Sequence, residues 1–291
     1  MSRLEPVVRD ATRDCIAAFA CRGEADLATE LGQLVPAHVI ADLMGFPRTD
    51  ASWFAGITDR LLETAERPEL ADENAALGGE LVDYLSKHLE ERCHEPRTDL
   101  LTDLLHGRID GEPLSAEDLL GMSFFFLIAG HETTVGGITF LLWRIGQLPE
   151  LRARLIAEPA LIPAAIEESL RIDSPVLHLA RTVTRDTEVG GSAMKAGDKV
   201  MCLYAAANRD EEVFPQADRF DIDRTNLKRH LAFSAGIHKC QGAAMGRLEM
   251  RVVLEEVLRE IPDFRLAGPI EHRSTQGAHA LRSLPVTFTA R

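Results

Sequence analysis

A single cysteine stands in a glycine-rich loop at the point where a long helical pattern begins. The stretch Phe233–Gly242 reads FSAGIHKCQG, and the apolar residues that follow it recur at helical spacing as far as Pro262. Cys240 therefore lies just before a helix N-terminus, where the positive end of the helix dipole and free backbone N–H groups favour a thiolate. Gly236 and Gly242 allow the backbone to pass close to a large, flat group.

A second group of reactive side chains lies in the sequence AGHETT of residues 129–134, inside a long apolar helical segment. Ala129 and Thr133 are four residues apart and share one helix face. Small side chains there would let a flat group approach, and Gly130 would tolerate a local opening of the helical hydrogen bonds. Glu132 and Thr133 then supply an acid and an alcohol beside that opening. Close packing alone is the alternative explanation of such small residues.

Two further patterns are weaker on their own. Glu168 and Arg171 are three residues apart on one helix face, and most exposed pairs of this kind contribute little to stability. Arg181 and His238, taken alone, are an exposed strand residue and a loop residue. Arg219 stands in a later stretch without periodicity.

Taken in this order, these motifs resemble the cytochrome P450 family, and most closely its soluble bacterial branch. The resemblance implies that Cys240 is the axial thiolate ligand of a haem iron, with haem b (iron protoporphyrin IX) as the cofactor. It implies that Arg181 and His238 hold the haem propionates, which need cationic or hydrogen-bonding partners. The other residues of the haem site would be Ala129, Gly130, Phe233, Gly236 and Gly242.

The same resemblance assigns roles to the remaining motif residues. Glu132 and Thr133 would deliver protons during oxygen activation. Glu168 and Arg171 would form a buried structural pair that an arginine from the later loop completes, and Arg219 is the candidate.

The implied function is a haem-thiolate monooxygenase that uses dioxygen to hydroxylate a small organic substrate, with electrons from NAD(P)H through a ferredoxin or similar donor. Lys239, with Lys228, Arg229 and Arg247 nearby in the sequence, could form a basic patch for an acidic donor, or could simply be solvated. Gln241 stands where the family usually has an apolar residue, and its amide could donate to the sulfur or to a haem propionate. The substrate-facing candidates are Leu127, Ala129, Val176, Leu177 and the turn around His279.

Composition narrows the class of protein. The chain has 291 residues, 45% of them hydrophobic, and a formal net charge of −14, which argues against nucleic acid as a partner. Five cysteines without a CxxC pair, and no signal peptide, favour a cytoplasmic protein. The most apolar run, Leu119 to Ala129, is too short for a membrane span, which needs about 20 apolar residues.

The elements that must position these residues are mainly helices. We expect one domain over residues 1–291, mainly α with small β-sheets, in a cytochrome P450-like fold. Hydrophobic spacing and turn residues predict helices over 4–22, 34–45, 50–92 with a break near Pro68, 115–147 and 163–171, and a helix after the cysteine loop. They predict strands over 179–184, 187–189 and 199–203, a loop over 208–232, and a C-terminal strand pair that includes 286–288.

The start of the chain resembles the interior of family sequences, so we expect the N-terminal portion of the family fold to be absent. An alternative function is therefore a catalytically inactive, truncated remnant with weak or no haem binding. A thiol-based redox protein is disfavoured, because Cys240 has no second cysteine near it in the sequence to resolve a disulfide.

Overall fold

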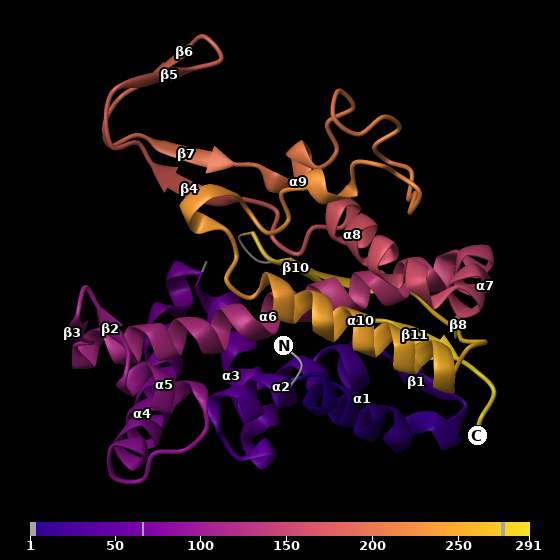
Figure 1. Ribbon diagram of the computed structural model, residues 1–291, viewed down its shortest axis with the longest axis horizontal. Coiled ribbons are helices and arrows are strands. Elements are labelled where there is room, and N and C mark those ends of the chain that lie inside the picture. Colours follow the sequence, from indigo (N-terminus) through magenta and orange to yellow (C-terminus); the bar gives the residue numbers. More distant parts are fainter. Residues whose placement is uncertain (1–3, 66, 275–276) are drawn as a thin grey trace.

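The fold is mainly helical, with small antiparallel sheets, as the sequence predicts (Figure 1). The computed structural model describes residues 4–65, 67–274 and 277–291. Its α-helices are α1 (Glu5–Phe19), α2 (Leu34–Met44), α3 (Ala51–Thr64), α4 (Ala71–His94), α5 (Leu100–Leu105), α6 (Ala116–Gln147), α7 (Pro149–Ala157), α8 (Ile162–Ile172), α9 (Tyr204–Ala207) and α10 (Ala243–Glu260).

The strands are short and lie between or after these helices. They are β1 (Glu24–Asp26), β2 (Arg108–Ile109), β3 (Glu112–Pro113), β4 (Leu179–Thr182), β5 (Thr187–Val189), β6 (Ser192–Met194), β7 (Lys199–Cys202), β8 (Arg265–Leu266), β9 (Glu271–Ser274), β10 (His279–Ser283) and β11 (Pro285–Thr287).

Helix α6 runs through the middle of the molecule and contacts α2, α8, α10 and β10 (Figure 1). It begins where the sequence predicts, because the Ser115 hydroxyl accepts the backbone N–H of Asp118 at 3.0 Å. By length and composition it could cross a membrane, but 67% of its most apolar window is buried inside the protein. It is therefore the core helix of the fold.

Two hydrophobic clusters meet on this helix. One packs the second half of α6 against α1, α8 and α10, with Ile138 and Leu142 fully buried. The other packs the first half of α6 against α2 to α5, where Leu127 is fully buried. Because α6 belongs to both clusters, it fixes the two groups of helices relative to each other.

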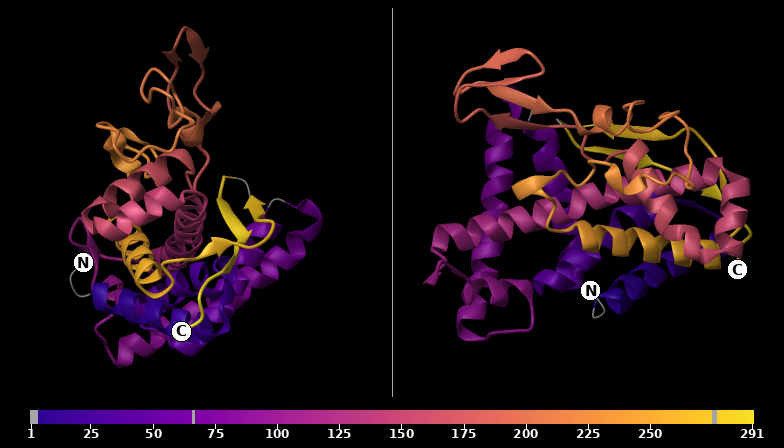
Figure 2. Two further views of the ribbon diagram at one scale, coloured as in Figure 1. Left: turned by 90° about the vertical axis from the view of Figure 1, so that its right-hand side faces the viewer. Right: turned by 45° about the horizontal axis from the view of Figure 1, so that its top comes forward.

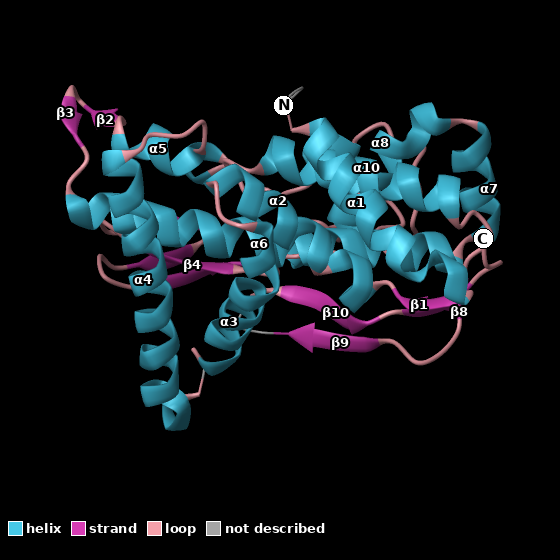
Figure 3. Ribbon diagram, turned by 90° about the horizontal axis from the view of Figure 1, so that it is seen from below, coloured by secondary structure: helices cyan, strands magenta, loops and turns pink. Residues whose placement is uncertain are grey.

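The last strand joins the two ends of the chain. β11 pairs with β1 on one side, with Glu24 opposite Thr287, and with β8 on the other. A C-terminal strand at this position agrees with the sequence, and so does its pairing with another strand of the same terminus, β8. Its second pairing, with β1 near the start of the chain, was not predicted. β9 and β10 form a separate antiparallel pair that lies against α6 (Figure 3).

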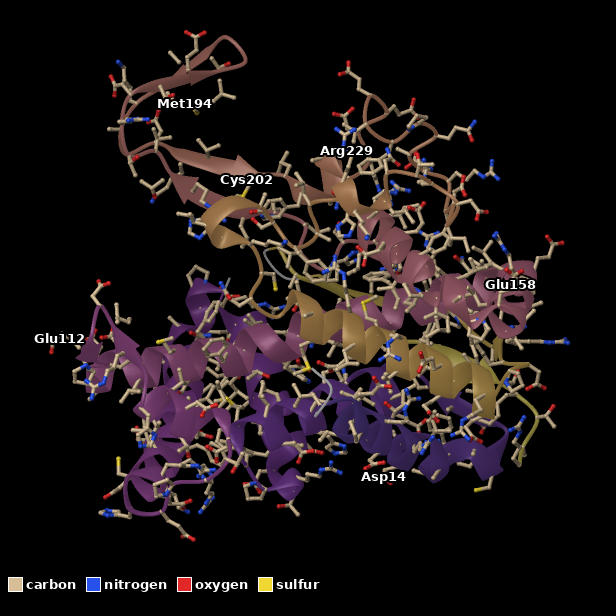
Figure 4. The ribbon with its side chains drawn as sticks, in the orientation of Figure 1. Asp14, Glu112, Glu158, Met194, Cys202 and Arg229 are labelled. Atoms are coloured by element: carbon tan, nitrogen blue, oxygen red, sulfur yellow. The ribbon has the colours of Figure 1, made fainter. Side chains whose placement is uncertain are left out.

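The strands after α8 form two small sheets. β4 pairs with β7, and the β5–β6 hairpin projects from them away from the helices (Figure 2). Figure 4 places Met194 on this projecting hairpin and Cys202 at the inner end of β7. The predicted strands agree with β4, β5 and β7 to within two residues, and β6 was not predicted.

The predicted helices are confirmed, and the loop over 208–232 contains only a short helical turn at Leu227–Arg229. Gly23 and Gly45 end the first two helical segments with φ of 72° and 74°, the left-handed conformation that favours glycine. Three helices were not predicted, namely α5, α7 and α9, and the first and last are too short to show a hydrophobic period.

Close packing of α6 depends on two adjacent glycines. A Cβ atom at Gly136 would collide with the backbone oxygen of His279 on β10, and one at Gly137 would lie 3.0 Å from the sulfur of Met250 on α10. At Gly121, in the exposed first turns of the same helix, a Cβ atom would meet nothing within 4 Å of the described atoms.

Gly136→Ala should therefore lower the free energy of unfolding by about 1–3 kcal/mol, because β10 must shift to admit the methyl group. Gly121→Ala should raise it by up to about 1 kcal/mol, because alanine has the higher helix propensity. Chemical denaturation of both variants checks this pair of results. Equal effects of the two substitutions would contradict the packing role of Gly136.

Candidate functional site

A mostly apolar cavity of about 370 Å³ lies between α6 and the loop that leads into α10. Residues of α6, α8, β4, α9, α10 and the connecting loops line it. They are Phe125, Ala129, Gly130, Thr133, Thr134, Gly137, Leu170, Pro175, Val176, Leu179, Tyr204, Ala232, Phe233, Ser234, His238, Cys240, Gly242, Met245, Gly246 and Met250. The predicted cysteine and the predicted threonine thus line one cavity.

The cysteine loop is a tight turn that exposes its thiol. The backbone N–H of Cys240 donates to the carbonyl oxygen of Phe233 at 2.9 Å, and that of Lys239 donates to Gly236 at 3.1 Å. Ser234 and Gly236 have φ of 56° and 66°, so the chain reverses through left-handed backbone at both residues. The Cys240 side chain is exposed. The residue lies shortly before α10, which begins at Ala243, and a helix at this place is what the sequence predicts.

Next to this loop, the carboxylate of Glu167 on α8 binds two side chains, those of Arg247 and His230. Its carboxylate accepts hydrogen bonds from Arg247 at 2.6 and 2.9 Å and contacts His230 Nε2 at 3.0 Å. The Ala232 N–H donates to His230 Nδ1, so Nε2 carries the ring proton and donates to Glu167. Burial alone would raise the pKa of Glu167, but the bonds from Arg247 and His230 outweigh it and lower this pKa to about 2.

This network corrects the predicted basic patch. The Arg247 guanidinium packs 4.4 Å from the centre of the Phe233 ring and pairs with Glu167, so it is not available as a free surface charge. Lys228, Arg229 and Lys239 remain exposed. Figure 4 shows Arg229 among the loops at the top of the view, away from the N-terminal helices at the bottom.

The α6 side of the cavity is formed by small and hydroxyl residues. Thr133 donates to the carbonyl oxygen of Ala129 at 3.0 Å, and Thr134 donates to that of Gly130 at 3.3 Å. The α-helix is continuous from Ala116 to Gln147, so the predicted opening at Gly130 is not present. Both hydroxyls instead bond back to the carbonyls of the preceding turn.

Several predicted residues lie away from this cavity lining. Glu132 is buried on another face of α6, where Arg273 of β9 binds its carboxylate. Among the substrate-facing candidates, Ala129 and Val176 line the cavity. Leu127 belongs to the helical core instead, and Leu177 and His279 also lie outside the lining.

The polar edge of the cavity contains two residues that sequence analysis did not identify, Tyr204 and Ser234. Arg181 donates to the Tyr204 hydroxyl at 3.3 Å, and Tyr204 shares a 3.0 Å hydrogen bond with Ser234. Tyr204, Ser234 and His238 line the cavity. Arg181 is not part of the lining and is connected to it through its hydrogen bond to Tyr204. Tyr204 belongs to α9, whose four residues give no recognisable sequence signal.

The buried pair of α8 has a different third member from the one predicted. Glu168 and Arg171 are fully buried and bond at 2.7 and 2.8 Å. The arginine that reaches Glu168 is Arg224, at 3.1 Å, and not Arg219. Arg219 contributes only its backbone carbonyl, which accepts from Arg171 and Arg224, while its side chain is exposed. The conformation of the loop, and not its distance in sequence from Glu168, determines that Arg224 is the arginine that binds this carboxylate.

Comparison with known proteins identifies one family. The family model described as "Cytochrome P450" matches residues 70–267. The chain is 36% identical over 258 residues to a cytochrome P450 of Bacillus subtilis, covering 87% of this chain and 63% of that protein. It is 34% identical over 297 residues to a methyl-branched lipid omega-hydroxylase of Mycobacterium bovis, covering 99% of this chain and 69% of that protein.

A solved structure has the same fold. The ligand-free structure of cytochrome P450 TbtJ1 superposes with a TM-score of 0.92 at 34% sequence identity, covering 99% of this chain and 77% of that one. The chain belongs to the cytochrome P450 family. It spans between 63 and 69% of the length of the two relatives named above.

Arg224→Ala should lower the free energy of unfolding by about 3–5 kcal/mol, because Glu168 would lose one of its buried cationic partners. Arg219→Ala is the matched control, since the backbone carbonyl that it contributes is retained; its effect should be within about 0.5 kcal/mol. Thermal or chemical unfolding of the two variants checks this. A larger loss in Arg219→Ala would restore the role predicted from the sequence.

Proposed function

We propose that this chain is a haem-thiolate monooxygenase that uses dioxygen to hydroxylate a small organic substrate. The observation that carries the proposal is the exposed thiol of Cys240 in the lining of the same apolar cavity as Thr133 of α6. Membership of the cytochrome P450 family supports it, as does the relative that is named as a lipid omega-hydroxylase.

The cavity suits haem b. Its lining is largely apolar, as a flat macrocycle requires, and Gly242 lines it beside Cys240 without a side chain. At the polar edge, Arg181, Tyr204 and His238 offer a cation and hydrogen-bond donors for the propionates. The small side chain of Ala129 leaves room on the α6 side, whereas the missing side chain of Gly130 makes room for Ile40 of α2.

Each residue then has a distinct task. Cys240 would hold the iron as its thiolate, and a bound haem would supply oxygen activation, which a thiolate ligand favours. The Thr133 hydroxyl is a proton donor in the cavity lining on the α6 side. Glu132, one residue earlier, is the acid that replenishes the proton. The Glu167–Arg247–His230 network fixes the cysteine loop from behind.

The remaining assignments concern substrate, electron donor and compartment. The apolar residues Val176, Leu179 and Phe125 would contact a hydrophobic organic substrate. Electrons would come from NAD(P)H through a ferredoxin or similar acidic donor near the exposed Lys239 and Arg229. All five cysteines, each of which the structure describes, are free thiols, which supports a reducing cytoplasm.

A catalytically inactive remnant with weak or no haem binding is the alternative. Titration of the purified chain with haem separates the two functions. We expect one haem per chain and a reduced carbon monoxide adduct with the spectrum of thiolate ligation. Substoichiometric, non-saturating binding would instead support the remnant.

Cys240→Ser should remove the thiolate-type spectrum of the reduced carbon monoxide adduct, because a serine hydroxyl does not ionise to replace the thiolate. Cys93→Ser, at an exposed position of α4, is the matched control and should keep the spectrum of the parent. If the Cys240→Ser spectrum is also unchanged, the iron ligand is a different residue.

Thr133→Ala should keep haem content but lower the product formed per NAD(P)H by about tenfold or more, with the lost electrons recovered as peroxide. Thr133→Ser restores a hydroxyl at the same position and should recover most of the coupling. Product and peroxide are measured together in each variant. Coupling at the parental level in Thr133→Ala would exclude a proton-donating role for this residue.

A further inference from the structure

A buried polar cluster joins three elements on a face of α6 outside the cavity lining. It consists of Asp59 of α3, His131 and Glu132 of α6, and Arg273 of β9, and is called the Glu132 cluster below. Arg273 donates to Asp59 Oδ2 at 2.8 Å and to Glu132 Oε1. The side chains of Glu132 and Arg273 are 5% and 8% exposed, and that of Asp59 is 23% exposed. Figure 3 shows β9 and α3 on the same side of α6.

Three acceptor atoms converge in this cluster without a donor. Asp59 Oδ1, Glu132 Oε2 and His131 Nδ1 are buried and lack a hydrogen-bond partner among the described residues. One nitrogen or carboxylate oxygen from each of these three side chains lies within 4.8 Å of the other two. His131 Nε2 contacts the carbonyl oxygen of Gln33 at 3.2 Å. A carbonyl only accepts, so Nε2 carries the ring proton and Nδ1 is an acceptor. A proton on one carboxyl group would give these atoms the donor that they lack.

The charge of the cluster leads to the same requirement. With both carboxylates ionised, two negative charges face one guanidinium, which leaves one buried negative charge uncompensated. A single added proton makes the cluster neutral. Burial raises the pKa of Glu132 to about 7, with Arg273 opposing and Asp59 reinforcing the effect. Burial also lowers the pKa of His131, so the imidazole stays neutral and accepting.

We propose that Asp59 and Arg273 are positioning residues for Glu132, which hold one proton on the Glu132–Asp59 carboxyl pair and keep that pair outside the cavity lining. This rests on the proposed function of Glu132 as the acid that replenishes the Thr133 proton. The proton enters from solvent through the partly exposed Asp59, and the O–H of the protonated carboxyl group donates to the second carboxylate or to His131 Nδ1. The cluster is therefore the place where the proposed monooxygenase stores its proton.

The proposal gives a defined dependence of stability on pH. The pKa of Glu132 is raised from 4.5 to about 7 in the folded protein. The stabilisation that proton binding gives the folded state is therefore fully present below pH 4.5 and is lost as the pH rises to about 7. Above that pH the cluster carries a net negative charge, and α3 and β9 are held to α6 less strongly.

A divalent cation is the other species that could occupy the three acceptors. The guanidinium of Arg273 already binds one oxygen of each carboxylate, so a doubly charged ion there would leave the cluster with a net positive charge and close to another cation. A proton is therefore the favoured occupant, and direct metal titration tests the alternative.

The test is infrared titration of the purified 291-residue chain, which follows the carbonyl stretch of protonated carboxylic acids between pH 5 and 9. We expect a band from the Glu132 cluster to disappear with a midpoint near pH 7. Glu132→Gln should remove this band and flatten the decline of the unfolding midpoint between pH 4.5 and 7. Asp59→Asn should move the titration midpoint downward by about one unit or more, because a carboxylate that raises the pKa of Glu132 is gone.

Glu249 of α10 supplies a matched control. It is fully buried, and burial raises its pKa to about 8, so it should give a second acid band that Glu249→Gln removes without changing the first. A band near pH 7 that survives in Glu132→Gln would overturn the proposal, and so would an unshifted midpoint in Asp59→Asn. Stoichiometric binding of Zn²⁺ or Mn²⁺ that Asp59→Asn abolishes would identify a cation site instead. Because the readout needs neither haem nor turnover, its outcome is separate from that of the Cys240→Ser experiment.

Discussion

The segment between α9 and α10 has almost no regular secondary structure, so its shape depends on charged side chains of α8. Glu168 binds Arg224 and the backbone N–H of Asp221, while Arg171 binds the carbonyl of Asn208. The neighbouring Glu167 holds the side chains that support the cysteine loop. Two adjacent glutamates on one buried helix thus fix both the loop and the residue that it presents to the cavity. Such buried charges are tolerated because each one has several partners.

Helix α6 has a second constraint, because it must serve several neighbours at once. Its glycines admit β10 and α10 at close range, its threonines line the cavity, and Glu132 enters the buried cluster with Arg273. A helix turns by about 100° per residue, so adjacent residues necessarily face different surroundings. The mixture of small, hydroxyl and acidic residues in one short stretch follows from this geometry.

Features carried by local sequence were predictable, and features that depend on loop conformation were not. The spacing around Cys240 indicated both the glycine-containing loop and the helix that follows it, because the turn is made by neighbouring residues. Arg224 and Arg219 could not be distinguished, since both stand in a segment without periodicity. The Arg273 partner of Glu132 is equally hidden, because the two residues are 141 positions apart and no pattern connects them. Prediction from the sequence identified Cys240 and Thr133, which line one cavity, but missed several of the residues around them.

The different surroundings of Glu132 and Thr133 bear on how an acid and an alcohol can act together. Their adjacency in sequence suggests a shared location, but Thr133 lines the cavity and Glu132 is held by Arg273 outside that lining. Under the proposed function, a proton stored on the Glu132 carboxyl group has to pass from this buried cluster to the cavity before it reaches the Thr133 hydroxyl. The ion pair with Arg273 opposes that movement while it holds the carboxyl group in place. Asp59 binds the other terminal nitrogen of the same guanidinium, so Arg273 is shared between the two carboxylates.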